Sequence, residues 1–385
     1  MTGDLRTIAL RCVAIAAILT LTACGSAPLP SPDPTSTSAS TPEATVGPEP
    51  EQPDVASRPA DRVPLSCDEL INEDARALAM GQLKSTISLK TSSVSNSMIS
   101  FLQGGMLTCQ WESSKAVTGE GASWELSLEI LPDAADDFQA MAASFPTDGF
   151  TTGLIGPDSL VSCIGEVSKR SCTMRFENDG YWVQLSFNGH TTLAASDPSL
   201  ADDAVQIGTA VRDALAAAGP PRPAFVPAAD AATGWDDCAD VDSNEAFRTE
   251  LSSPSFVAPE GYWTGASMFS FAMDRAGFTM CVWRHNNVYG TPAGELRQVG
   301  IEMIPGAAWA WPELVADALA KNPAAEISVA GAEAAVLVCW DANECTVQAL
   351  VRGSYVAANA SNEQRNTADA RSGAIRALEL AIAAL

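Results

Sequence analysis

Histidine and basic residues are scarce in this sequence. Its 385 residues include only two histidines, His190 and His285, and 22 lysines and arginines stand against 47 aspartates and glutamates, for a formal charge of −25. This balance argues against a nucleic-acid partner, because such an interface needs a basic surface. The histidines do not lie beside cysteines in the sequence, which disfavours a zinc site. We expect neither nucleic-acid binding nor histidine chemistry.

The recognised sequence patterns of catalytic and cofactor sites are also missing. The chain contains no Gly-x-Ser-x-Gly, Ser-x-x-Lys or His-Glu-x-x-His pattern and no dinucleotide-binding glycine motif. Asp240–Asn244 begins like a calcium loop, but Glu245 stands where that loop needs glycine and Leu251 where it needs a bidentate glutamate. We therefore expect no enzymatic activity, no cofactor and no metal. A hydrolase built from carboxylates distant in sequence stays open as a lesser alternative.

The N-terminus has the features of an export signal. Arg6 and Arg11 precede an apolar run over residues 12–21, and this run is too short to span a bilayer. The run ends in Leu21-Thr22-Ala23-Cys24, which resembles the lipobox of bacterial lipoproteins. The resemblance implies a signal peptide over residues 1–23 and acylation of Cys24, anchoring the chain at the extracytoplasmic face of the cell membrane. A plain secretory signal cut near Ala23 is the alternative. No later segment has 18 uninterrupted apolar residues, so no transmembrane helix is expected.

The segment after Cys24 has the composition of a tether. Ten of the 39 residues from 26 to 64 are proline, and ten more are serine or threonine. With few large apolar side chains, such a segment cannot offset its ordering entropy. We expect residues 24–64 to be extended and disordered.

The rest of the chain contains an internal repeat, in which one sequence unit occurs twice. Leu128-Glu-Ile-Leu-Pro-Asp-Ala-Ala135 matches Ile301-Glu-Met-Ile-Pro-Gly-Ala-Ala308, and Cys109-x-Trp111 matches Cys281-x-Trp283. A Pro-rich stretch lies between the copies. This predicts a first repeat over 65–218, a linker over 219–234 and a second repeat over 235–385.

The order of elements is expected to be the same in both repeats. Residues 124–130 and 299–304 read as strands, the first alternating apolar and polar residues, and each is stopped by a proline. Helices are expected over 68–80, 134–144, 201–217, 311–321 and 367–384, and further strands at the Cys-x-Trp segments and over 160–163, 172–177, 181–187 and 355–359. The fold class is therefore α+β, with two tandem homologous domains, each an antiparallel sheet packed with helices.

The cysteine count fits this division. With Cys12 removed in the signal and Cys24 acylated, four cysteines remain in each repeat, and four cysteines permit three connectivities. We favour short-range pairing, because residues nine or six apart are readily joined across a hairpin. The expected bridges are Cys67–Cys109, Cys163–Cys172, Cys238–Cys281 and Cys339–Cys345.

Aromatic residues provide the one hint of a binding surface. The second repeat carries Trp309 and Trp311 on either side of a helix start, where both cannot face one core. Ordinary core and loop packing is the interpretation we prefer. The alternative is that one of them is exposed as a candidate ligand contact.

The lipobox, the tether, Cys67-Asp-Glu-Leu70 and the Cys-x-Trp motif together resemble actinobacterial cell-envelope lipoproteins. Each repeat is also similar to the disulfide-stapled sensor ectodomain of mycobacterial serine/threonine kinases. In the second repeat the Cys-x-x-Leu motif becomes Cys238-Ala-Asp-Val241. The resemblance implies a non-enzymatic, lipid-anchored binding or sensor protein that recognises an envelope protein, a glycan or a lipid. The alternative is a carrier that encloses a lipid or glycolipid in a hydrophobic cavity.

Overall fold

The structure is a computed structural model, and it describes most of the chain from residue 57 onward. The predicted signal peptide, Cys24 and residues 24–56 of the predicted tether lie outside the described residues. The described ranges are 57–80, 88–89, 95–112, 124–144, 149–166, 169–190, 200–242, 246–257, 259–261, 267–287, 289, 291–292, 294–322, 324–340, 343–363 and 367–385.

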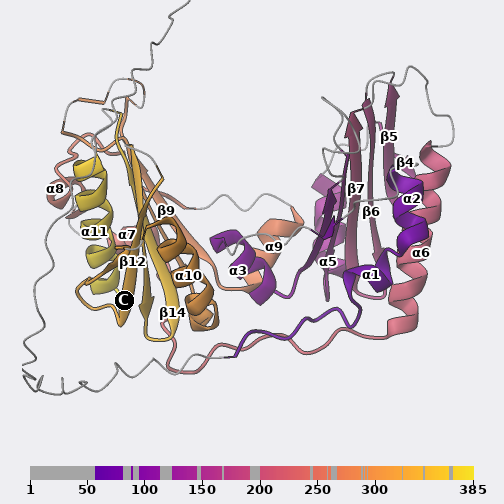
Figure 1. The fold of residues 1–385 in the computed structure, drawn as a ribbon, viewed down its shortest axis with the longest axis horizontal. Coiled ribbons are helices and arrows are strands. Elements are labelled where there is room, and N and C mark those ends of the chain that lie inside the picture. The colour runs from indigo at the N-terminus through magenta and orange to yellow at the C-terminus, as the bar shows by residue number, and fades with distance from the viewer. Residues whose placement is uncertain are drawn as a thin grey trace, which may run out of the picture. The chain divides into compact units, whose positions relative to one another are not determined.

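Each repeat contains an antiparallel sheet, seven strands wide within the described residues (Figure 1). The first sheet has the order β1-β2-β3-β7-β6-β5-β4, and the second has the order β8-β9-β10-β14-β13-β12-β11. The strands are β1 (Ser88–Leu89), β2 (Leu107–Glu112), β3 (Trp124–Leu131), β4 (Thr151–Thr152), β5 (Leu160–Glu166), β6 (Lys169–Asn178), β7 (Tyr181–His190), β8 (Glu260–Gly261), β9 (Thr279–Arg284), β10 (Gln298–Ile304), β11 (Glu326–Ile327), β12 (Ala334–Cys339), β13 (Glu344–Val351) and β14 (Ser354–Ser361).

The two strand orders are the same when each β-strand is matched to its counterpart in the other repeat. The expected fold class, α+β with two similar tandem domains, is therefore confirmed. The helices are α1 (Cys67–Leu70), α2 (Glu73–Met80), α3 (Asn96–Gln103), α5 (Ala135–Ser144), α6 (Leu200–Ala218), α7 (Cys238–Val241), α8 (Ala246–Glu250), α9 (Met268–Arg275), the 3₁₀ turn η2 (Ala307–Ala310), α10 (Trp311–Lys321) and α11 (Thr367–Ala383).

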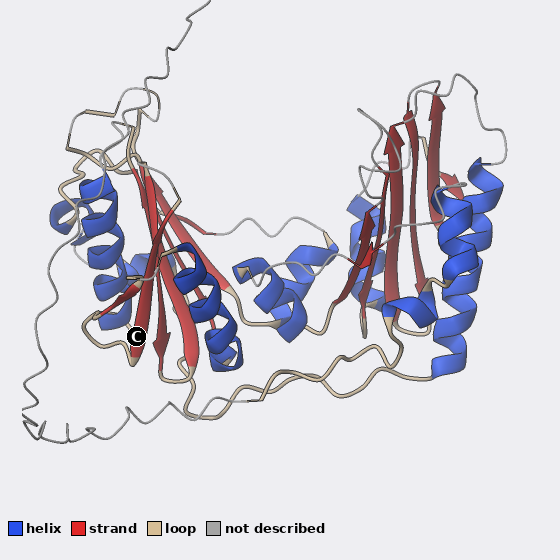
Figure 2. Cartoon of the chain, viewed as in Figure 1, coloured by secondary structure: helices blue, strands red, loops and turns tan. Residues whose placement is uncertain are grey.

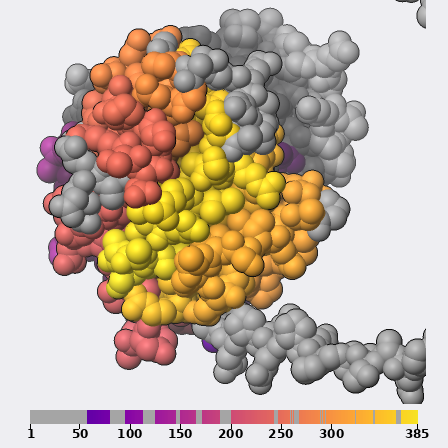
Figure 3. Space-filling view, turned by 90° about the vertical axis from the view of Figure 1, so that its left-hand side faces the viewer, coloured from indigo at the N-terminus to yellow at the C-terminus, as the bar shows by residue number. Residues whose placement is uncertain are grey.

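One face of each sheet is covered by the closing helix of its own repeat (Figure 2). In the first repeat, α6 buries Ile207, Val211 and Leu215 against the sheet, together with α1 and α2. In the second, α11 contacts β13 and β14, and Figure 3 shows the C-terminal residues in yellow across the surface that faces the viewer. Alternate strand residues point into these cores, as strand geometry requires.

The first helix of each repeat starts at a capping box. Ser66 and Glu69 reciprocally bond each other's backbone N–H groups at α1, and Asp237 and Asp240 do the same at α7. The helix expected over 68–80 is divided: α1 ends at Leu70 and α2 begins at Glu73, with Asn72 accepting a hydrogen bond from the Ala75 N–H group. The single long helix was therefore a wrong prediction.

The opposite face of each sheet is covered in part by a helix from the other repeat. Ile99 of α3, in the first repeat, packs among Ile304, Leu314 and Tyr355 of the second. Met268 and Ala272 of α9, in the second repeat, pack into a cluster of the first. That cluster also contains Leu131, Phe138 and Trp182. The two helices contact each other, so the repeats exchange one helix each.

The exchanged helices make corresponding contacts. Both begin at a serine N-cap, Ser95 or Ser267. Near the C-terminal end of α3, the Gln103 side-chain amide donates to the Pro305 carbonyl of the second repeat. At the same position of α9, Arg275 donates to the Pro132 carbonyl of the first. Pro132 and Pro305 are themselves equivalent, so the exchange follows an internal two-fold relation between the repeats.

The last part of the predicted tether belongs to this packed region. Val63 is buried, and Arg62 pairs with Asp133 and donates from Nε to the Arg222 carbonyl, 3.0 Å away. The Arg222 N–H group in turn donates to the Arg62 carbonyl at 2.9 Å. Residues 57–64 therefore run along the linker as part of the fold.

Candidate functional site

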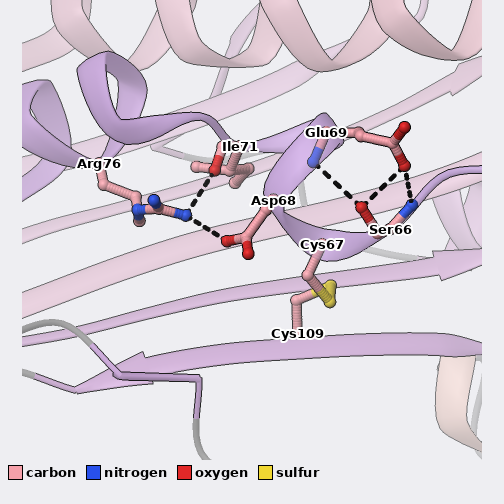
Figure 4. The surroundings of a disulfide bond; sticks show 7 residues. All are labelled: Ser66, Cys67, Asp68, Glu69, Ile71, Arg76 and Cys109. Atoms are coloured by element: carbon pink, nitrogen blue, oxygen red, sulfur yellow. Dashed lines mark hydrogen bonds and ion pairs between the residues drawn. A yellow bond between two sulfur atoms is a disulfide. The ribbon is translucent and has the colours of Figure 1, made fainter.

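All eight cysteines of the two repeats form disulfides, in the pairing expected from the sequence. Cys67–Cys109 and Cys238–Cys281 close loops of 42 and 43 residues, and Cys163–Cys172 and Cys339–Cys345 close loops of nine and six. Each short bridge joins directly opposed residues of neighbouring strands. Figure 4 shows the first long bridge beside the capping box of α1. No thiol of the described residues is free for catalysis.

Trp309 and Trp311 are both buried, which confirms the preferred interpretation of core packing and contradicts the alternative that one of them is exposed as a ligand contact. Trp309 donates from Nε1 to Gln103 Oε1 at 3.2 Å, and both rings lie in the cluster that Ile99 joins. The second side of this core is supplied by α3 of the other repeat, which sequence reasoning on one repeat did not consider. Neither tryptophan is available as a surface ligand contact. Tyr262 and Trp263 lie outside the described residues.

The side chain of His285 has described contacts, and they are structural. His285 is buried, with Nδ1 3.0 Å from the Asn287 backbone and Nε2 3.3 Å from Glu295 Oε2. These contacts tie a loop to the end of β9, which is a structural role. The side chain of His190 lies outside the described residues, although its backbone ends β7.

The strongest candidate for a functional surface is a polar face on the first sheet. Strand register places four side chains in each of three rows across β2, β3, β7 and β6, on the side opposite the α6 core. We call this set the polar face. Its rows are Thr108, Glu129, Gln184 and Arg175; Gln110, Ser127, Ser186 and Thr173; and Glu112, Glu125, Asn188 and Ser171.

Hydrogen bonds between neighbouring strands order much of this face. Ser127 and Ser186 share a hydroxyl–hydroxyl bond of 2.8 Å, and Arg175 Nε donates to Gln184 Oε1 at 2.9 Å. In the second sheet the corresponding rows are Met280, Glu302, Ala357 and Gln348; Val282, Gly300, Asn359 and Thr346; and Arg284, Gln298, Ser361 and Glu344. Polar residues fill all three rows in the first repeat, whereas apolar residues and a glycine interrupt the two inner rows of the second.

Glu302 is held by a network that includes the exchanged helix. Asn96 of α3 donates from Nδ2 to Glu302 Oε1, and the Tyr355 hydroxyl donates to Asn96 Oδ1 at 2.5 Å. Although Glu302 keeps some accessible surface, the protein atoms packed around it raise the pKa of its carboxyl to about 7, against the opposing effect of the Asn96 bond. Burial, and then the charge of Glu302, raise the pKa of Tyr355.

The corresponding network of the first repeat is incomplete. Burial raises the pKa of Glu129 to about 7, while bonds from Ser127 and Gln184 lower it. Within the described residues, however, Glu129 Oε2 has no hydrogen-bond partner, and neither does Trp182 Nε1 or Thr108 Oγ1. Trp182 is the counterpart of Tyr355, and the position of Asn96 is taken by Met268, which lies in the cluster with Trp182. Sequence reasoning missed Glu129, although the match of Leu128-Glu-Ile-Leu-Pro with Ile301-Glu-Met-Ile-Pro keeps a glutamate at this position in both repeats.

Metal binding and membrane crossing find no support in the part of the chain that is described. No three histidine, cysteine, aspartate or glutamate side chains gather there in a way that would hold a metal ion. None of the helices in those residues combines the length and hydrophobicity that crossing a bilayer requires.

Comparisons with known proteins add little. No protein-family model matches the chain, and no curated protein matches it. Among solved structures, the di-domain ARO/CYC StfQ from the steffimycin biosynthetic pathway is similar at 10% sequence identity. That likeness covers 78% of this chain and 97% of the other, with a TM-score of 0.17. Similarity of this degree carries no argument about function.

Proposed function

We propose that the chain is a lipid-anchored, extracytoplasmic binding or sensor protein without enzymatic activity, attached to the cell membrane through Cys24. The observation that carries the proposal is the set of four disulfides, which use every cysteine after Cys24. Stable disulfides of this density belong to an oxidising compartment. The lipobox-like Leu21–Cys24 adds the membrane attachment, and the resemblance to actinobacterial envelope lipoproteins and kinase sensor ectodomains supports the same assignment.

The binding surface in this proposal is the polar face. A sheet face of hydroxyl, amide and carboxyl groups supplies many hydrogen-bonding groups on rigid elements, and most of its side chains are partly exposed. The clusters packed on both sides of each sheet fill the two cores, so a carrier would have to use the open pocket of about 760 Å³ beside the linker, which Phe225, Val226 and Leu350 help to line.

The anchor is tested by replacing Cys24 with alanine in an actinobacterial host. We expect the Cys24→Ala protein to leave the membrane fraction and to lose incorporation of labelled palmitate. The matched control is Cys12→Ala, which lies in the predicted signal and should leave the protein membrane-bound. Retention of Cys24→Ala in the membrane would contradict the anchor.

Binding is tested separately by native mass spectrometry of the secreted Cys24→Ala chain. A bound mass that is lost on denaturation supports ligand recognition. If neither a bound mass nor a captured envelope component is found, the binding function is wrong even if the anchor is right.

A further inference from the structure

An open pocket of about 760 Å³ lies between the linker and the second sheet. Linker residues form one wall. The other wall comes from the residues after β10, the turn between β13 and β14, and the residue before β12. The volume is within the range of small-molecule sites, roughly 300–1,000 Å³. Because the polar face belongs to the first sheet, the pocket is a separate place on the molecule.

Hydrogen bonds fix the two walls of the pocket against each other. The Ala232 N–H group donates to the Arg352 carbonyl at 3.2 Å. Ser354 Oγ donates to the Ala232 carbonyl at 2.9 Å and accepts from the Gly306 N–H group at 3.0 Å. Pro227 of the linker lies so close to Gly306 that a Cβ added to this glycine would be 2.8 Å from the proline Cβ. The fold therefore holds the pocket in place before any ligand binds.

The lining of the pocket has an apolar part and an acidic part. Phe225, Val226 and Leu350 supply the apolar part, and the Val226 side chain is 80% exposed, so it can contact a ligand. Asp230 and Glu333 supply the acidic part. Among the described residues, neither carboxylate has a hydrogen-bond or ion-pair partner.

The charge of the lining favours a cation. Its basic side chain, among the described residues, is that of Arg352, which donates from Nη2 to the Leu385 carbonyl at 3.0 Å. Two carboxylates therefore outweigh one guanidinium, and this balance favours a cationic ligand group over an anionic one. The formal charge of −25 acts in the same direction, because it attracts cations from a distance.

The first repeat uses the corresponding place differently. Strand register matches Leu350 with Glu177. The alignment of the repeats matches Gly306 with Asp133. Glu177 Oε1 accepts a hydrogen bond from a backbone N–H group at 2.7 Å, and Asp133 pairs with Arg62. The fold itself thus satisfies these carboxylates of the first repeat, whereas the two acidic groups of the pocket stay open to a ligand.

We propose that the pocket binds a small amphiphilic amine, with its ammonium group at Asp230 and Glu333. The ammonium group donates hydrogen bonds to the two carboxylates. The apolar chain or ring of the amine lies against Phe225, Val226 and Leu350, where its surface is removed from water. This site goes beyond the surface binding proposed above and does not depend on it.

The test is a calorimetric titration of the secreted Cys24→Ala chain with octylamine at neutral pH. We expect one saturable site. Octanoate has a chain of the same length with the opposite charge and should show no saturable binding. Methylamine carries the charge without the chain, so it should bind at least about tenfold more weakly, because it buries less apolar surface.

Paired charge variants separate the pocket from the general attraction of an acidic protein for cations. Asp230→Asn with Glu333→Gln removes both carboxylates of the pocket and should weaken octylamine binding about tenfold, as two exposed ion pairs allow. The matched control is Asp236→Asn with Glu326→Gln, which changes the net charge equally outside the lining and should bind like the parent chain. All four substituted residues are exposed, so the variants should fold like the parent chain.

A further variant tests the apolar contact. Val226→Ser shortens an exposed side chain of the apolar part and should weaken octylamine binding by about threefold. Binding that is unchanged in this variant would show that the ligand lies elsewhere and would overturn the proposal.

Three other results would also overturn the proposal. Octylamine could show no saturable binding. Octanoate could bind as tightly as octylamine. The two paired charge variants could weaken binding equally, which would show only a general attraction for cations. A failed titration combined with a bound mass in native mass spectrometry would remove this site and leave the proposed function in place.

Discussion

The two repeats share a scaffold and differ where each receives the helix of the other. Strand order, disulfide pairing and the capping box before the first cysteine are the same in both. At the exchanged helices, however, α3 brings a hydrogen-bonding asparagine to the second sheet, whereas α9 brings Met268 to the first. The difference shows that a duplicated fold can keep its stabilising parts while one copy completes a buried polar network and the other leaves it open.

The exchange also makes the stability of each repeat depend on the other. Ile99 and the buried Gln103 belong to the first repeat in sequence but to the second repeat in packing. Met268 and Ala272 show the reverse relation. A local change in either repeat is therefore expected to affect one joint unfolding transition.

The largest predicted effect is the loss of a long disulfide. Replacing Cys67 and Cys109 by alanine opens a 42-residue loop and should lower the free energy of unfolding by roughly 4 kcal/mol. Removal of Cys238–Cys281 should cost a similar amount, and removal of Cys163–Cys172, with its nine-residue loop, only about 2.5 kcal/mol. Denaturant unfolding followed by tryptophan fluorescence measures each value.

Calorimetry of the same variants tests the coupling between repeats. A single transition at lower temperature is expected whichever long bridge is removed. Two separate transitions, with the untouched repeat unfolding at its original temperature, would show that the helix exchange does not couple the repeats.

The next effect in size concerns Glu129, which is buried, and Glu302, which is partly buried. Because the pKa of each is raised to about 7 by folding, the folded state holds protons that the unfolded state releases. Their contribution to stability is complete below about pH 4.5 and is lost as the pH rises through 7. The free energy of unfolding therefore falls as the pH rises. Glu129→Gln and Glu302→Gln should each make this fall smaller by on the order of 2–3 kcal/mol.

Unfolding free energies at pH 5 and pH 8 check both variants against the wild type. Equal flattening by the two substitutions is expected, because burial is the main cause of both shifts. A flat profile for the wild type would contradict the raised pKa values. If only Glu302→Gln reduced the pH dependence of the unfolding free energy, the Glu129 carboxylate would have to be stabilised by a group that the structure does not place beside it.

Local patterns in the sequence predicted the elements whose partners lie in the same repeat. The expected helix over 311–321 matches α10, and the expected closing helix over 201–217 differs from α6 by one residue at each end. The disulfide pairing followed from the division into four cysteines per repeat and from the short separations that a hairpin closes. These predictions needed only periodicity, caps and loop length.

Elements whose partners lie in the other repeat were not predicted. Ser95 and Ser267 are ordinary N-cap residues, so α3 and α9 could have been found as helices. Nothing in their sequence says that each covers the other repeat's sheet. The helix exchange explains two features of the structure. It buries Trp309 and Trp311, and it leaves the hydrogen-bond network at Glu129 incomplete.

The smallest predicted effect tests the contact between the exchanged helices. Gly104 follows α3, and a Cβ added there would lie 2.0 Å from the Ala272 carbonyl oxygen of α9. Because the clashing atom belongs to the backbone and cannot move easily, Gly104→Ala should lower the free energy of unfolding by about 2 kcal/mol. This exceeds the few tenths of a kcal/mol that alanine gains by restricting the unfolded chain. The equivalent residue after α9, Ala276, already carries a Cβ, so the two-fold relation is imperfect here. Urea unfolding measures the loss, with Gly156→Ala, which meets no neighbour within 4 Å, as the control. If Gly104→Ala were as stable as that control, α3 and α9 would not lie this close together, and the described contact between the exchanged helices would be wrong.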